Sequence, residues 1–93
     1  MARSKREQKR NAITAKLNEI ESIKKELEDL HSATADDINE ATELRRQLRE
    51  MDQDSEAAYE IQNEIRAIDE RVRFNSNTIL DLRDRLDALT SPR

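Results

Sequence analysis

A seven-residue repeat of apolar side chains runs through most of this 93-residue chain. Every seventh residue from Ile23 to Leu86 is apolar, with Asp37 as the one exception. An α-helix makes two turns in about seven residues, so the repeat marks one stripe along a helix. A stripe of this length is typical of a coiled coil, in which long helices pack along a shared seam. The sequence therefore predicts an all-α protein.

The composition agrees with long helices. Glycine is absent, and charged residues make up 41% of the chain against 34% for hydrophobic residues. Without glycine, tight turns that need a left-handed backbone are costly, so few turns are expected. The apolar residues are too regularly spaced for a disordered chain, and the length allows one domain at most. The lack of cysteine excludes disulfides and thiolate metal sites.

A second apolar position accompanies the first and changes sides midway. In the first half it lies three residues earlier, as Ile20 does before Ile23. In the second half it lies three residues later, as Ile68 does after Ile65. The apolar stripe thus swings around the helix near residues 55–58. An unbroken helix would be mismatched there, whereas two helices joined by a turn would not.

We therefore predict a long antiparallel helical hairpin, similar to a coiled coil, over residues 11–91. The helices are expected at about 8–51 and 56–90, with a turn at about 52–55, where Ser55 and neighbouring acids suit a helix N-terminus. In this register Leu27 lies beside Leu82, and Asp37 lies near Arg71. A basic tip, residues 1–10, and a few following residues would project beyond the second helix.

Two other architectures remain open. The polar stretches 31–37 and 73–79 also contain capping residues, Thr34 and Asn75 among them. Bends at both of these stretches, in addition to the turn at about 52–55, would give a compact four-helix bundle. No bend at all would give one rod of more than 80 residues, paired with a copy of itself.

Association is expected in each case, because a two-helix hairpin shields only one side of each apolar stripe. A second copy would complete a four-helix dimer or a higher oligomer. The residues expected in the core and oligomer seam are Ile20, Ile23, Leu27, Leu30, Leu44, Leu48, Met51, Ile61, Ile65, Ile68, Val72, Ile79, Leu82, Leu86 and Leu89.

Other apolar residues lie outside a strict seam. Leu17, Ile38, Tyr59 and Leu80 follow one another at intervals of 21 residues and widen the stripe. Such widening favours more than two helices packing together. Phe74 points away from the seam, which suits either an ordinary surface residue or an anchor for another chain.

The basic tip is the second candidate contact site. Arg3, Lys5, Arg6, Lys9 and Arg10 stand against one acid in the first ten residues. Such a tip can keep the chain soluble, dock on an acidic protein, or bind a phosphate backbone through residues 3–16. No aromatic residue interrupts these charges, so stacking on bases is not expected.

Catalysis is not expected. His31 is the one histidine, the chain has no glycine-rich phosphate loop, and Asp36 and Asp37 suit the first turn of a helix. We expect no metal, no cofactor and no membrane span, because no apolar run reaches the roughly 20 residues that a bilayer requires. The basic N-terminus lacks the apolar stretch of a secretory signal, which favours the cytoplasm or a larger intracellular or virion assembly.

The sequence thus favours a non-catalytic interaction or assembly protein of the scaffolding, adaptor or inhibitor type, viral ones included. It would act by self-association and by helix-face contacts with a larger protein. The alternative is a dimeric, nucleic-acid-associated regulator that binds phosphates through its basic N-terminus.

Overall fold

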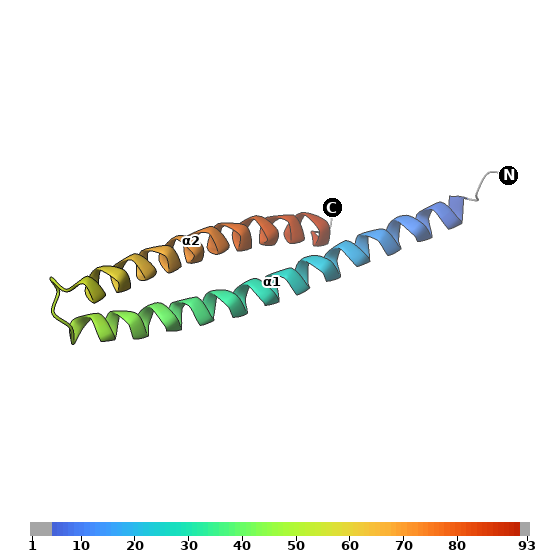
Figure 1. Ribbon diagram of the computed structural model, residues 1–93. Helices are drawn as coiled ribbons and strands as arrows, with labels where there is room; N and C mark the ends of the chain where they lie inside the picture. Colours follow the sequence, from blue (N-terminus) through green and yellow to red (C-terminus); the bar gives the residue numbers. More distant parts are fainter. Residues whose placement is uncertain (1–4, 92–93) are drawn as a thin grey trace.

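The computed structural model describes residues 5–91, which form two helices (Figure 1). Helix α1 spans Lys5–Arg49 and helix α2 spans Glu56–Thr90. The chain reverses between them, so α2 returns along α1 in the antiparallel direction (Figure 1). The described chain measures 75 × 27 × 14 Å. The predicted all-α antiparallel hairpin is confirmed.

Helix α1 is longer than α2, at 45 residues against 35. Its N-terminal part therefore runs beyond the C-terminal end of α2 (Figure 1). We call residues 5–16 the overhang. The overhang carries four of the five basic residues predicted as a contact site, and the fifth, Arg3, lies outside the described residues.

The turn begins two residues earlier than predicted, because α1 ends at Arg49 rather than at residue 51. The Gln53 side chain donates a hydrogen bond of 2.6 Å from Nε2 to the carbonyl oxygen of Leu48. The last carbonyls of a helix have no partner within the helix, so a side chain can satisfy them and stop its growth. Met51 donates its backbone N–H to the same carbonyl oxygen, at 3.2 Å.

Helix α2 begins with an N-cap at Ser55, the position that the sequence suggests. The Ser55 hydroxyl accepts a hydrogen bond of 3.1 Å from the backbone N–H of Ala58. Glu56 places a negative charge in the first turn, where the exposed N–H groups favour it. The N-cap and this acid together fix where the returning helix starts.

The polar stretches 31–37 and 73–79 are helical throughout. The helices pass straight through them, so the compact four-helix bundle is not formed. The turn at 50–55 likewise excludes the unbroken rod. Thr34 and Asn75 are therefore polar positions inside long helices, not caps.

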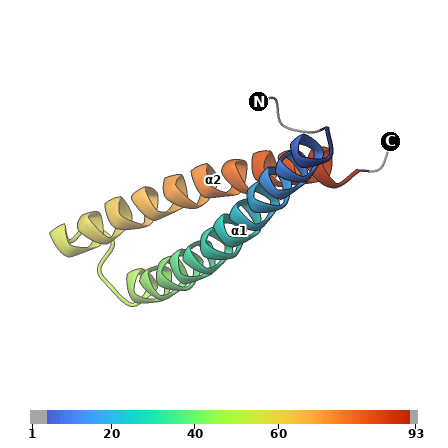
Figure 2. The ribbon, with the colours of Figure 1, turned by 90° about the vertical axis from the view of Figure 1, so that its right-hand side faces the viewer.

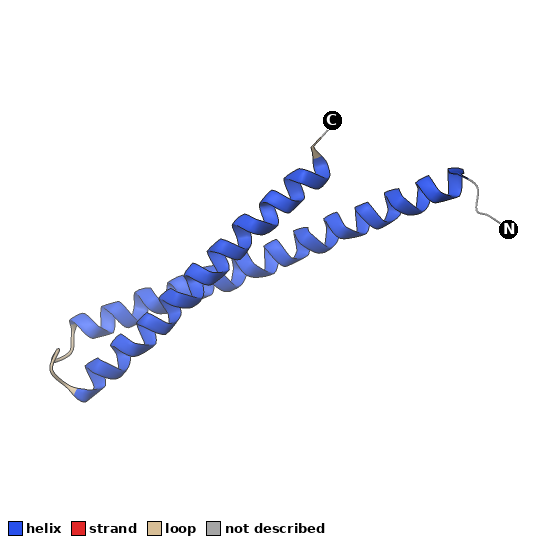
Figure 3. Ribbon diagram, turned by 90° about the horizontal axis from the view of Figure 1, so that it is seen from above, coloured by secondary structure: helices blue, strands red, loops and turns tan. Residues whose placement is uncertain are grey.

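The two helices cross along their length, as the turned views show (Figures 2 and 3). The buried apolar side chains all lie where one helix faces the other. They are Ile23, Ala41, Ala58, Ile65, Ile68, Ile79 and Leu82. No large side chain of the described chain is completely buried, as expected for a layer only two helices thick.

Candidate interaction surfaces

One edge of the hairpin is held by contacts between α1 and α2. Arg45 Nη2 binds both carboxylate oxygens of Asp69, at 2.9 and 2.7 Å. Further from the turn, Arg83 Nη2 lies 3.4 Å from His31 Nε2. The lone histidine thus sits beside an arginine on an exposed edge of the helix pair.

The opposite edge carries a second pair of contacts. Arg71 binds Asp37 through Nε and Nη2, at 3.0 and 2.8 Å. Arg85 Nη2 lies 3.5 Å from Glu19 Oε1. These contacts on both edges set the register and place Leu27 level with Leu82, as the sequence predicted.

Asp37 is the one polar residue in the seven-residue repeat, and its carboxylate is paired with Arg71. Its side chain is only 14% exposed, whereas that of Arg71 is 54% exposed. The hydrogen bonds from Arg71, aided by its positive charge, lower the pKa of Asp37 although burial acts in the opposite direction. The same pairing raises the pKa of Arg71.

Thr34 and Asn75 form a polar layer next to this ion pair. The register places them at the same level, and both are half-buried. The Thr34 hydroxyl oxygen is buried and has no hydrogen-bond partner within residues 5–91. A buried hydroxyl without a partner destabilises the folded state, so this layer is a weak point of the hairpin.

The residues predicted for the seam all lie on the covered side of their helices. Ala41 and Ala58, which also lie in the repeat, are buried although we did not include them, because their small side chains signal a core position weakly. The predicted residues that are buried are Ile23, Ile65, Ile68, Ile79 and Leu82. Those that are half-buried are Ile20, Leu27, Leu30, Leu44, Leu48, Met51, Ile61, Val72, Leu86 and Leu89.

Several large apolar side chains remain at the surface. The four that recur at intervals of 21 residues are each at least half exposed, and Phe74 is 71% exposed. Ile13 continues the seam into the overhang, where α2 no longer runs beside it, and is 60% exposed. Single exposed apolar residues are ordinary, but here the hairpin leaves whole sides of both helices without a covering element.

The basic residues of the overhang are all exposed. Lys5, Arg6, Lys9 and Arg10 lie on consecutive turns of α1 beyond the end of α2. At the opposite end of the hairpin Glu50, Asp52, Asp54 and Glu56 surround the turn. The long axis of the described chain therefore runs from a basic end to an acidic end.

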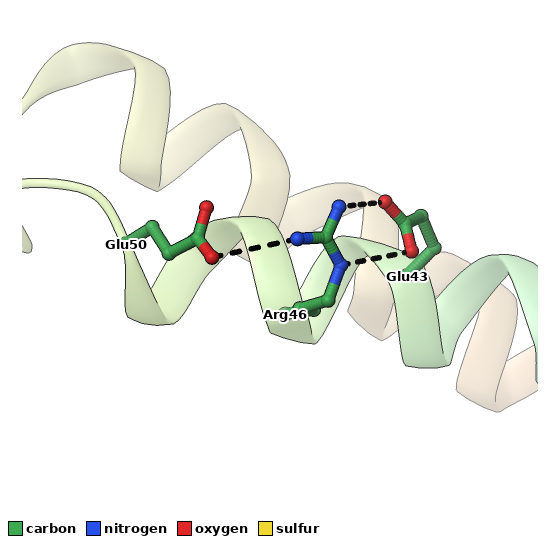
Figure 4. Close-up of polar contacts among 3 residues, drawn as sticks. All are labelled: Glu43, Arg46 and Glu50. Atoms are coloured by element: carbon green, nitrogen blue, oxygen red, sulfur yellow. Dashed lines mark hydrogen bonds and ion pairs between the residues drawn. The ribbon is translucent and has the colours of Figure 1, made fainter.

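A third charged cluster lies on α1 just before the turn (Figure 4). Arg46 binds Glu43 on one side and Glu50, at 3.4 Å, on the other. The hydrogen bond from Arg46 lowers the pKa of Glu43, and the pKa of Arg46 is raised in turn. Because all three side chains come from α1 and its end, this cluster stabilises the helix and does not join the two helices.

The described residues give no sign of a small-molecule site. Within residues 5–91 there is no pocket and no group of three His, Asp or Glu side chains that could hold a metal ion. In the same range no helix combines the length and the apolar character needed to cross a membrane.

Comparison of the chain with protein-family models, curated proteins and solved structures gives no match.

Proposed function

We propose that this protein is a non-catalytic interaction and assembly module that associates with itself and offers its helix faces to a larger protein. The observation that carries this proposal is the incomplete covering of a two-helix hairpin. Six large apolar side chains are half or more exposed, although the seam between the helices is already filled. Exposed apolar area that recurs along a rigid helix pair is typical of a surface that another chain covers.

The shape supports the same proposal. A chain 75 Å long, 27 Å wide and 14 Å thick presents a large surface for its mass. Its exposed side chains lie on rigid helices, so binding would order few additional backbone torsions. We propose an intracellular setting, because a chain without cysteine needs no oxidising compartment to fold.

The proposal is tested by measuring the mass of the protein in solution. We expect multi-angle light scattering to give more than one chain per particle. Removal of residues 1–10 should leave the number of chains per particle unchanged. Ile65→Asp should disrupt the assembly together with the hairpin on which it depends, because it places a charge in the buried seam between α1 and α2. The matched control is Asn63→Asp, which adds the same charge at an exposed position two residues away.

A particle with the mass of one chain at every accessible concentration would contradict self-association. Loss of association after removal of residues 1–10 would move the assembly site to the overhang. The helical circular dichroism signal is recorded in parallel, because it separates loss of association from loss of the hairpin.

One observation favours a second candidate function, binding of a nucleic-acid backbone by the overhang. Residues 5–10 of the overhang carry four cations on a helix that protrudes past α2, where a phosphate chain could approach them. Affinity for a short DNA duplex would then fall with salt, with a slope of at most about −4 in a double-logarithmic plot. Binding that persists without residues 1–10 would contradict this candidate.

A further inference from the structure

The contacts between the helices define two broad faces of the hairpin with different chemistry. Ile38 lies one heptad from both His31 and Arg45, so it belongs to the edge that the His31–Arg83 and Arg45–Asp69 contacts mark. We call the side of the hairpin next to this edge the Ile38 face. The opposite side, next to the Asp37–Arg71 edge, is the Phe74 face.

The Ile38 face is apolar and mildly basic. The four apolar residues that recur at intervals of 21, Ile38 among them, all lie on it, since Tyr59 and Leu80 are one helical turn before Gln62 and Arg83. Its six cations outnumber its four acids. The cations are Lys24, Arg45, Arg49, Arg66, Arg73 and Arg83, and the acids are Glu21, Glu28, Asp69 and Asp87.

The Phe74 face is strongly acidic. Nine carboxylates on it stand against two cations, Arg71 and Arg85, and both of these cations are already paired across the edge. Small side chains such as Ala67 separate the charges on α2 and leave room for another chain to approach closely. The nine acids are Glu19, Glu26, Asp29, Asp36, Glu40, Glu43, Glu60, Glu64 and Asp81.

The contrast between the faces is greatest in the half of the hairpin near the turn. There the Ile38 face presents four cations against Asp69 alone, which Arg45 already binds. The Phe74 face presents acids on both helices there, Glu40 and Glu64 among them. The two faces therefore carry net charges of opposite sign.

This distribution of charge determines which kind of self-association it favours. A two-fold dimer through the Ile38 face would bring together two surfaces of net positive charge, and one through the Phe74 face would oppose nine acids to nine acids. A contact between unlike faces pairs opposite charges and covers the exposed Ile38 side chain. Such a contact is heterologous, so each copy keeps one unused face.

We propose that copies of this hairpin stack face to back, with the Ile38 face of one copy on the Phe74 face of the next. This inference rests on the proposed self-association and names the surfaces that carry it. Each added copy presents the same two faces again, so the stack grows unless something covers its ends. Attraction between the faces weakens as salt is added, because the charges lie at the surface.

The experiment uses one variant for each face. Ile38→Asp places a carboxylate on the Ile38 face, and a double variant, Glu60→Lys with Glu64→Lys, reverses charge on the Phe74 face. All three positions are exposed, so each variant is expected to keep the hairpin and its helical signal. Lys25→Glu, on the exposed outer side of α1, is the control for a change of charge alone.

Sedimentation velocity should show that each face variant alone associates at least about tenfold more weakly than the wild type. An equimolar mixture of the two should give particles of two chains and no larger ones, because one intact face remains on each. The wild type and the Lys25→Glu control should form larger particles as concentration rises.

Three results would overturn the inference. If the Glu60→Lys, Glu64→Lys variant dimerises by itself as well as the wild type does, the contact is between like faces, and self-association stands without stacking. If Ile38→Asp associates as the wild type does, the Ile38 face is not used. A wild type that never exceeds one chain would remove the inference and the proposed self-association together.

Discussion

Replacing Thr34 by valine should stabilise the hairpin, although it changes a residue on the covered side of α1. The Thr34 hydroxyl is buried and has no hydrogen-bond partner among residues 5–91. Thr42, on the same helix, differs because its hydroxyl donates to the carbonyl of Ile38 at 2.8 Å. Thr14, Thr78 and Thr90 make the same backward bond, four residues along the helix.

The magnitude follows from what the substitution removes. A buried polar group without a partner costs about 1–3 kcal/mol relative to an apolar group of the same shape. Valine keeps the volume and branching of Thr34, and the helix propensities of the two residues are similar. Because the residue is half-buried, we expect the lower part of this range, about 1 kcal/mol of added stability. The melting temperature should then rise by about 4–8 °C.

The measurement is urea unfolding followed by circular dichroism, at one fixed protein concentration because association would shift the midpoint. Thr34→Val should raise the midpoint without changing the slope of the transition. Thr42→Val is the control, and its stability should stay within about 0.5 kcal/mol of the wild type. If Thr34→Val is less stable than the wild type, or no different from Thr42→Val, the hydroxyl has a partner and the reasoning fails.

Three further predictions use the same unfolding assay. Ile68→Ala should cost about 2–4 kcal/mol, because the side chain is 4% exposed and its removal leaves a cavity in the seam. A loss below 1 kcal/mol would mean that the seam is not packed as described. Ser55→Ala should cost about 1 kcal/mol through the lost N-cap, whereas Ser22→Ala at an exposed helical position should not destabilise. Equal losses would refute the capping role. The lowered pKa of Asp37 means that its bond to Arg71 stabilises the fold above the ordinary aspartate pKa of about 3.9 and is lost as pH falls through the lower folded value. The stability advantage of the wild type over Asp37→Asn should therefore shrink below about pH 4, and an advantage that grows there would contradict this pairing.

The turn was predictable because two independent signals coincide. The apolar stripe changes sides near residue 55, and Ser55 followed by Glu56 suits a helix start. The exact end of α1 was not predictable from a pattern. It depends on a hydrogen bond from Gln53 to the carbonyl of Leu48, and glutamine has no strong preference for such a position.

The polar stretches were ambiguous for a physical reason. The capping residues at 31–37 and 73–79 suit a bend as well as they suit a continuous helix, so local chemistry could not distinguish these two outcomes. The pairing of side chains across the hairpin distinguishes them. Asp37 gains two hydrogen bonds from Arg71 only if both helices continue, and Thr34 then lies level with Asn75. An interaction between residues 34 positions apart decided what each stretch could not decide alone.

The two charged faces likewise could not be predicted from the sequence pattern alone. Along the chain, charge is seen as a basic start and an acidic middle. Across the hairpin, it depends on which side of the seam each residue takes, and the repeat alone does not show which sides of the two helices share a face. The Arg45–Asp69 and Asp37–Arg71 contacts supply that information, because they join matching edges. Residues such as Glu40 and Glu64 then fall on one face and Arg66 on the other, so a chain of net charge −4 separates its charges by side. Since surface charges interact over about 10 Å at moderate salt, this separation acts on a neighbouring copy more strongly than the net charge does.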